Sequence, residues 1–130
     1  MGGVFLAARH LGIVSKVAPE QITGAALDAA GSAPDDTVED AASTASHLAY
    51  GAANGAVFAV VGSRLPGGPL VRGLTFAGAL LLVSYEGWVP ATRVMAPLHR
   101  QTTGGRWTLI AGHAVYGTVL GLLTGCRTRP

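Results

Sequence analysis

Three long apolar runs, separated by short polar breaks, dominate the pattern of this sequence. They cover residues 41–62, 70–89 and 107–125. Each run is about 20 residues long, which is the length that an α-helix needs to cross the hydrocarbon core of a bilayer. The break at residues 63–69 reads Ser-Arg-Leu-Pro-Gly-Gly-Pro, and Pro and Gly end one helix and begin the next. The pattern therefore predicts an all-α, multi-pass bundle with three full transmembrane helices.

Two further segments precede these runs. Residues 1–15 are apolar but too short to span a bilayer, and we expect a partial N-terminal helix there. Residues 16–40 hold six of the seven acids and are predicted to form a short acidic helical segment outside the bilayer. Within it, Gly31 ends one helix and the segment Pro34-Asp35-Asp36-Thr37 caps the next. Residues 1–130 together are predicted to be a single membrane domain.

The composition supports the membrane assignment. Hydrophobic residues make up 49% of the chain and charged residues only 12%. A soluble domain typically has about 25% charged residues, so this chain has too few charges to form a water-facing surface. The basic residues are scattered, which speaks against a nucleic-acid partner. We therefore predict that the protein lies in a lipid bilayer, which is its predicted partner.

The first and third runs share the pattern H-x-x-Y-G-x-x-x-G. The first run has His47, Tyr50, Gly51 and Gly55, and the third has His113, Tyr116, Gly117 and Gly121. On an α-helix the histidine and both glycines of each copy lie on one stripe, with the tyrosine beside it. Glycines at this GxxxG spacing let another helix approach closely, so we predict that the four glycines are helix-packing sites.

Several ionisable groups are expected at a similar depth in the membrane. His47 and His113 each lie about six residues inside the start of a span, and Glu86 lies about three residues before the end of another, so that their depths differ by about 5 Å. The predicted polar layer comprises Arg9, His10, His47, Tyr50, Glu86, His113 and Tyr116, and Tyr85 and Trp88 flank it. Such groups usually face the bundle interior, where they form either a structural hydrogen-bond network or a functional site.

Glu86 is expected to be paired rather than free. A carboxylate a few residues inside the bilayer is unfavourable unless a cation or several donors compensate it. The candidate partners are Arg9, His10, His47, His113 and Arg93. Arg9 is the strongest candidate because it stays protonated at any relevant pH.

Several short motifs follow one another along the chain. They are Pro19-Glu20-x-Ile22-Thr23, Ala26-Leu27-Asp28-x-Ala30-Gly31, the His47-centred start of a span, Gly87-Trp88-x-Pro90 and Gly112-His113-x-x-Tyr116-Gly117. In their order and spacing they cover most of residues 16–122, and the chain resembles a family of uncharacterised bacterial inner-membrane proteins of the YagU-like kind. The resemblance implies a four-helix protein of the bacterial inner (plasma) membrane. It implies no known activity and no catalytic residue.

The distribution of Lys and Arg residues gives only a weak indication of how the protein is oriented in the membrane. The Lys and Arg residues are nearly balanced between the two sides. The acidic segment and the family resemblance favour a cytoplasmic C-terminus.

Three hypotheses for the function remain open. The first is a non-enzymatic packing or accessory subunit of a homo-oligomer or of a larger membrane complex, because the glycine stripes offer more close-packing surface than one small bundle uses. The second is a conduit or sensor for protons or small polar solutes that uses the His/Glu layer. The third is a haem or metal site between His47 and His113. The first two hypotheses need no cofactor, and no catalytic motif is found in the sequence.

Overall fold

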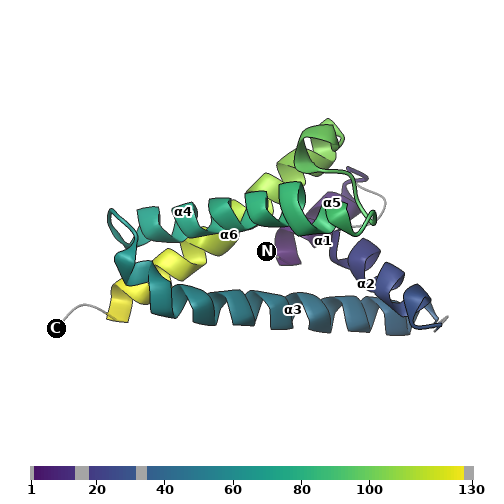
Figure 1. The fold of residues 1–130 in the computed structure, drawn as a ribbon, viewed down its shortest axis with the longest axis horizontal. Coiled ribbons are helices and arrows are strands. Elements are labelled where there is room, and N and C mark those ends of the chain that lie inside the picture. Colours follow the sequence, from purple (N-terminus) through teal and green to yellow (C-terminus); the bar gives the residue numbers. More distant parts are fainter. Residues whose placement is uncertain (1, 14–17, 32–34, 128–130) are drawn as a thin grey trace.

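The computed structural model describes residues 2–13, 18–31 and 35–127, which form helices and no strand (Figure 1). The elements are α1 (Gly2–His10), α2 (Ala18–Ala29), α3 (Asp36–Val61), the 3-10 turn η1 (Gly62–Arg64), α4 (Pro69–Leu82), the π-helix η2 (Val83–Trp88), α5 (Val89–Ala91), the 3-10 turn η3 (Leu98–Arg100) and α6 (Thr103–Arg127). The predicted all-α class is confirmed for these residues.

Two of the described helices are long and apolar enough to cross a membrane. They are Pro69–Ala91, which runs through α4, η2 and α5, and Thr103–Gly125 of α6. Helix α3 has 26 residues but does not meet the same criterion. The polar side chains of His47 and Asn54 interrupt its apolar run, and acidic residues occupy its first turns. By length and composition, these two helices are compatible with the predicted membrane protein.

Helices α4 and α6 touch backbone to backbone. A Cβ atom built on Gly117 would lie 2.6 Å from the carbonyl oxygen of Gly73, and one built on Gly121 would lie 2.6 Å from that of Pro69. A Cβ on Gly73 would in turn overlap the Gly117 carbonyl oxygen. Only glycine permits an approach this close, so these three residues fix where the two helices cross.

Helix α3 approaches the α4–α6 pair less closely. A Cβ on Gly51 would lie 4.0 Å from the Tyr116 ring, and one on Gly55 would lie 3.7 Å from Leu120, which are ordinary van der Waals distances. Figure 1 shows α3 as a long helix on one side of the pair, with α2 against its N-terminal part. The two glycines of α3 therefore face α6 across a layer of side chains.

The ends of α3 are fixed by local contacts. Asp35, within the predicted capping segment, is its N-cap, and its carboxylate accepts a hydrogen bond of 2.9 Å from the Val38 N–H. At the other end Phe58 is 2% exposed and contacts Phe76 of α4, with ring centroids 5.2 Å apart. An aromatic pair of this kind holds α3 to α4 next to the turn that joins them.

The second predicted span is not a plain α-helix. Residues 83–88 form the π-helix η2, in which the Val89 N–H donates to the Ser84 carbonyl five residues earlier. The predicted second span ends at residue 89, before Pro90, whereas the helix continues through Pro90 to Ala91. Proline cannot donate a backbone hydrogen bond, and its ring crowds the carbonyl four residues before it. The wider π-turn just before Pro90 accommodates both effects.

Replacing Gly73 by Ala tests the α4–α6 contact. We expect Gly73→Ala to destabilise the protein by about 1–3 kcal/mol, because the new methyl group forces the two backbones apart. Gly78→Ala on the same helix is the control, since nothing lies within 4 Å of its added Cβ. The control should be neutral or stabilising by up to about 1 kcal/mol. The free energy of unfolding is measured by circular dichroism during titration with a denaturing detergent, and equal effects of the two substitutions would contradict the contact.

Candidate functional site

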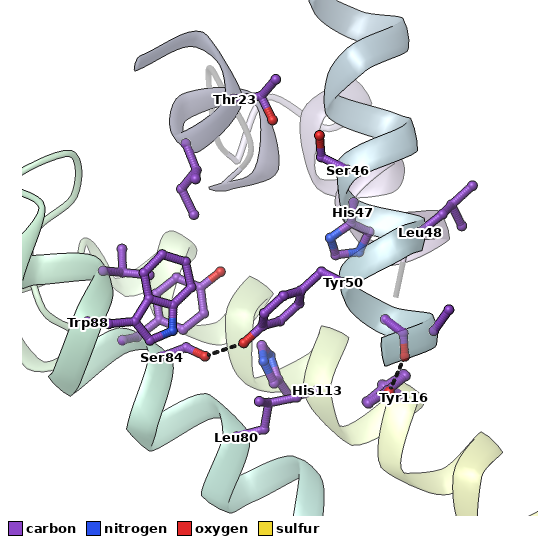
Figure 2. Close-up of a pocket in the computed structure, with 15 residues that line it drawn as sticks. Thr23, Ser46, His47, Leu48, Tyr50, Leu80, Ser84, Trp88, His113 and Tyr116 are labelled. Atoms are coloured by element: carbon purple, nitrogen blue, oxygen red, sulfur yellow. Dashed lines mark hydrogen bonds between the residues drawn. The ribbon is translucent and has the colours of Figure 1, made fainter. Parts of the chain in front are cut away.

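A cavity of about 410 Å³ lies between α3 and the α4–α6 pair (Figure 2). Side chains from α2, α3, α4, η2, α5 and α6 line it. Its volume is in the range of sites that bind small molecules, which is about 300–1,000 Å³. The looser approach of α3 to the pair leaves this space open.

Both copies of the repeated motif contribute to the cavity. His47 and Tyr50 line it from α3, and His113 and Tyr116 line it from α6. His113 is 5% exposed, whereas Tyr50 at the rim is 40% exposed. Four of the seven residues of the predicted polar layer therefore share one cavity.

Two tyrosine hydroxyl groups connect α3 to its neighbours across the cavity. The Tyr116 hydroxyl donates a hydrogen bond of 2.6 Å to the Gly51 carbonyl oxygen of α3. The Tyr50 hydroxyl lies 3.1 Å from Ser84 Oγ of η2, and these two groups share a hydrogen bond (Figure 2). These bonds hold α3 to both other helices where backbone contact is missing.

The hydrogen bond of His113 determines which of its ring nitrogens can accept a hydrogen bond within the cavity. His113 Nδ1 lies 2.9 Å from the Leu109 carbonyl oxygen. A carbonyl oxygen only accepts, so Nδ1 carries the proton of this bond. In the neutral ring Nε2 then has a lone pair and acts as an acceptor. The ring also meets Tyr85 edge to face, with centroids 5.8 Å apart at 87°.

The π-helix η2 forms one wall of the cavity with Ser84, Tyr85 and Trp88. Trp88 is 43% exposed and contacts the Tyr50 ring, with centroids 6.3 Å apart. π-Turns inside α-helices often mark functional sites. Ser84 is a site residue that the sequence analysis missed, because a single serine in an apolar run carries no signal without knowledge of the π-turn.

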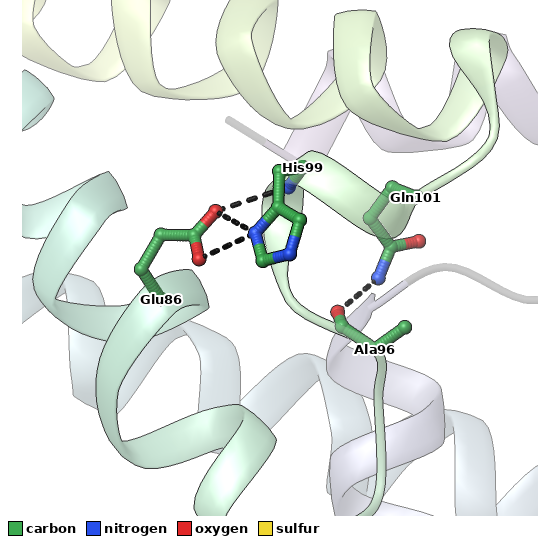
Figure 3. Close-up of polar contacts among 4 residues, drawn as sticks. All are labelled: Glu86, Ala96, His99 and Gln101. Carbon is green, nitrogen blue, oxygen red and sulfur yellow. Dashed lines mark hydrogen bonds and ion pairs between the residues drawn. The ribbon is translucent and has the colours of Figure 1, made fainter.

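Glu86 is not a lining residue of the cavity and pairs with His99 (Figure 3). Its Oε2 lies 2.8 Å from His99 Nδ1, and its Oε1 accepts a 3.0 Å hydrogen bond from the His99 backbone N–H. The structure thus shows Glu86 paired, but with a partner that the sequence analysis did not consider. His99 reaches Glu86 because η3 folds back beside η2. The side chain of Arg9, the strongest of the expected partners, lies outside what the structure describes.

Of the other predicted layer residues, the described side chains of His10 and Glu86 do not line this cavity. His10 is exposed on α1, and the side chain of Arg9 lies outside what the structure describes. Among the described residues, no group of three or more His, Cys, Asp and Glu side chains is arranged to hold a metal ion. His47 and His113 are the two such side chains that line the cavity.

Comparisons with known proteins give no match: no family model fits the chain, and neither a curated protein nor a solved structure is significantly similar to it.

The Glu86–His99 pair should hold the connection between α5 and α6 in place. We expect Glu86→Gln to speed tryptic cleavage after Arg100, the exposed residue next to His99, by about twofold to fivefold, which is the scale of an exposed ion pair. Asp28→Asn, at an exposed acid of α2, is the control and should leave the cleavage rate unchanged. Adding His99→Gln to Glu86→Gln should cause no further acceleration, and an additive increase would show that the two residues act independently.

Proposed function

We propose that this chain is a small integral membrane protein with three full spans that binds a small, largely apolar molecule between α3 and the α4–α6 pair. The cavity of about 410 Å³ at the junction of these helices carries the proposal. Binding sites for small molecules are concave and mostly apolar and contain a few polar groups that orient the ligand, and this cavity has that character.

The third span of this proposal is α3. Residues 41–61 form 21 helical residues, which at about 1.5 Å per residue reach about 31 Å, close to the thickness of the hydrocarbon core. Leu48, Val57 and Val60 on this helix are 67%, 50% and 66% exposed, and lipid would cover them. Asn54 Nδ2 donates to the Tyr50 carbonyl oxygen at 2.9 Å, so this polar side chain is satisfied within the helix.

The depth of the cavity favours a ligand that arrives through the lipid. Ser84 lies about 10 Å from the end of its candidate span at Ala91, and His113 lies about 15 Å from the start of its span at Thr103. The cavity therefore lies in one half of the bilayer. Leu48 and Trp88 at its rim are 67% and 43% exposed, which supports lateral access from the acyl chains.

A binding role fits the geometry better than a conduit. A conduit needs a polar path through the bundle, but the backbone contact of Gly73 with Gly117 leaves no room between α4 and α6. Glu86, the acid of the proposed path, pairs with His99 and does not line the cavity. Association with a second copy or with a larger membrane complex stays a prediction from the sequence.

Cysteine labelling tests whether α3 spans the membrane. Single cysteines are introduced as Thr37→Cys and Ser63→Cys, at exposed positions near the two ends of α3, in a chain with Cys126→Ser. We expect a membrane-impermeant maleimide to label them from opposite sides in right-side-out and inside-out vesicles. The predicted cytoplasmic C-terminus further places Ser63 on the cytoplasmic side. Labelling of both cysteines from the same side would exclude a spanning α3.

A cavity-filling substitution tests the binding site itself. Leu80 lines the cavity, whereas Leu82 on the same helix is not a lining residue and is 56% exposed. We expect the protein purified in mild detergent to retain a small molecule near one equivalent, measured by solvent extraction and mass spectrometry. Leu80→Trp should lower the retained amount about tenfold by occupying the space, whereas Leu82→Trp should retain as much as the parent. Equal retention by both variants, or none by the parent, would contradict the proposal.

A further inference from the structure

We propose, on the basis of the binding function above, that the ligand is a neutral amphiphile whose head is a hydroxyl-bearing aromatic ring of the phenol or hydroquinone kind. Its hydrocarbon tail leaves through the rim of the cavity into the lipid. The argument rests on the charge, the hydrogen-bonding groups and the aromatic walls of the cavity.

The lack of charged side chains among the described lining residues favours a ligand with an uncharged head group. No Asp, Glu, Lys or Arg side chain of the described residues lines the cavity. A charged head in such a site would lose its hydration without gaining an opposite charge, which is strongly unfavourable. Fatty acids, phospholipid phosphates and protonated amines are therefore poor occupants.

The hydrogen-bonding groups of the lining select a hydroxyl. His113 Nδ1 is committed to the Leu109 carbonyl, which leaves Nε2 as an acceptor. Tyr50 and Ser84 have two hydroxyl protons, and their mutual bond uses one of them. The other proton is available to a ligand, so His113 and this hydroxyl pair together present one acceptor and one donor, beside the further polar side chains of Thr23, Ser46, His47 and Tyr85 in the lining. A hydroxyl group donates and accepts at once and satisfies both.

Other neutral heads fit this pair of groups less well. A ketone, quinone or ester oxygen accepts from the Tyr50–Ser84 pair but offers no proton to His113 Nε2. An unpaired polar group in an apolar site weakens binding by the cost of its desolvation. The Tyr116 hydroxyl does not supply this proton, because it is bonded to the Gly51 carbonyl oxygen.

Aromatic side chains make the walls suitable for a planar ring. Tyr50, Tyr85, Trp88 and Tyr116 line the cavity together with the two imidazole rings. Figure 2 shows the Tyr50 and Trp88 rings close to each other, with the Tyr50 hydroxyl directed towards Ser84. Aromatic pairs gain offset-stacked or edge-to-face contacts beyond their buried area, which favours a ring over an aliphatic head. The exposed Leu48 and Trp88 at the rim then leave an exit for the tail.

The test measures binding of tritiated 4-dodecylphenol to the protein in lipid nanodiscs by scintillation proximity. The unlabelled competitors are 4-dodecylphenol, its methyl ether, which cannot donate, and 1-dodecanol, which lacks the ring. On the parent protein we expect the phenol to compete about tenfold better than either of the other two, the scale of one hydrogen bond or one ring contact.

Substitutions of cavity residues test whether the preference for the phenol arises from binding in the cavity. His113→Phe should weaken binding of the phenol about tenfold and reduce its preference over the ether to within about twofold. The double variant Tyr50→Phe/Ser84→Ala removes both hydroxyl protons of the donor pair and should weaken binding of the phenol and of the ether alike, so it keeps the test independent of how His113→Phe folds. His10→Phe, at an exposed histidine of α1, is the control and should match the parent.

The outcomes separate this inference from the binding function. If the ether or the alcohol competes as well as the phenol while Leu80→Trp still abolishes binding, the hydroxyl-ring assignment is wrong and the cavity remains a binding site. If the phenol does not bind saturably although the purified parent retains another molecule, the ligand class is again wrong. If the extraction also finds no retained molecule, the binding function itself fails.

Discussion

The backbone contact between α4 and α6 at Gly73, Gly117 and Gly121 is the constraint on which the rest of the structure depends. Between helices that already lie in lipid, the hydrophobic effect gives little net attraction, so close van der Waals contact must hold them together. The three glycines allow this contact at the N-terminal end of α4. Towards its other end, Leu81, Tyr85, Val89 and Leu109 form the buried core between the two helices. The pair is thus a firm unit against which the remaining helices are placed.

Helix α3 is attached to this unit in a different way. Phe58 packs on Phe76 near the connecting turn, and the tyrosine hydroxyls of the two motif copies make the bonds to Gly51 and Ser84. Directional bonds between side chains keep the helices at a fixed distance without closing the gap between them. The repeated motif therefore has two roles, because its glycines allow contact in α6 while its tyrosines act as spacers on both helices. The cavity exists because α3 is held by spacers and not by backbone contact.

Much of the fold follows from the sequence, because apolar length and Pro/Gly breaks determine where long helices lie. The cap at Asp35 follows from local chemistry for the same reason. The motif also indicated His47, Tyr50, His113 and Tyr116 as neighbours, and all four line the cavity. The partner of Glu86 did not follow, because His99 lies in a loop whose path depends on tertiary contacts. Gly73 and Ser84 were missed since neither belongs to a repeated pattern, and the resemblance to YagU-like proteins stays a prediction.

The π-helix η2 allows one continuous helix to pack against α6 before the π-turn and to face the cavity beside α3 within it. A π-turn contains one residue more than an α-turn, so the residues after it are rotated by about 100° relative to an uninterrupted α-helix. Ala77 and Leu81 before the turn are buried, with Ala77 next to Gly117 of α6, whereas Ser84 and Trp88 within the turn face the cavity beside α3. An insertion of a single residue would create such a turn from an ordinary α-helix without moving its ends far. The proposed binding surface would then differ from that of an ordinary packing helix by one inserted residue.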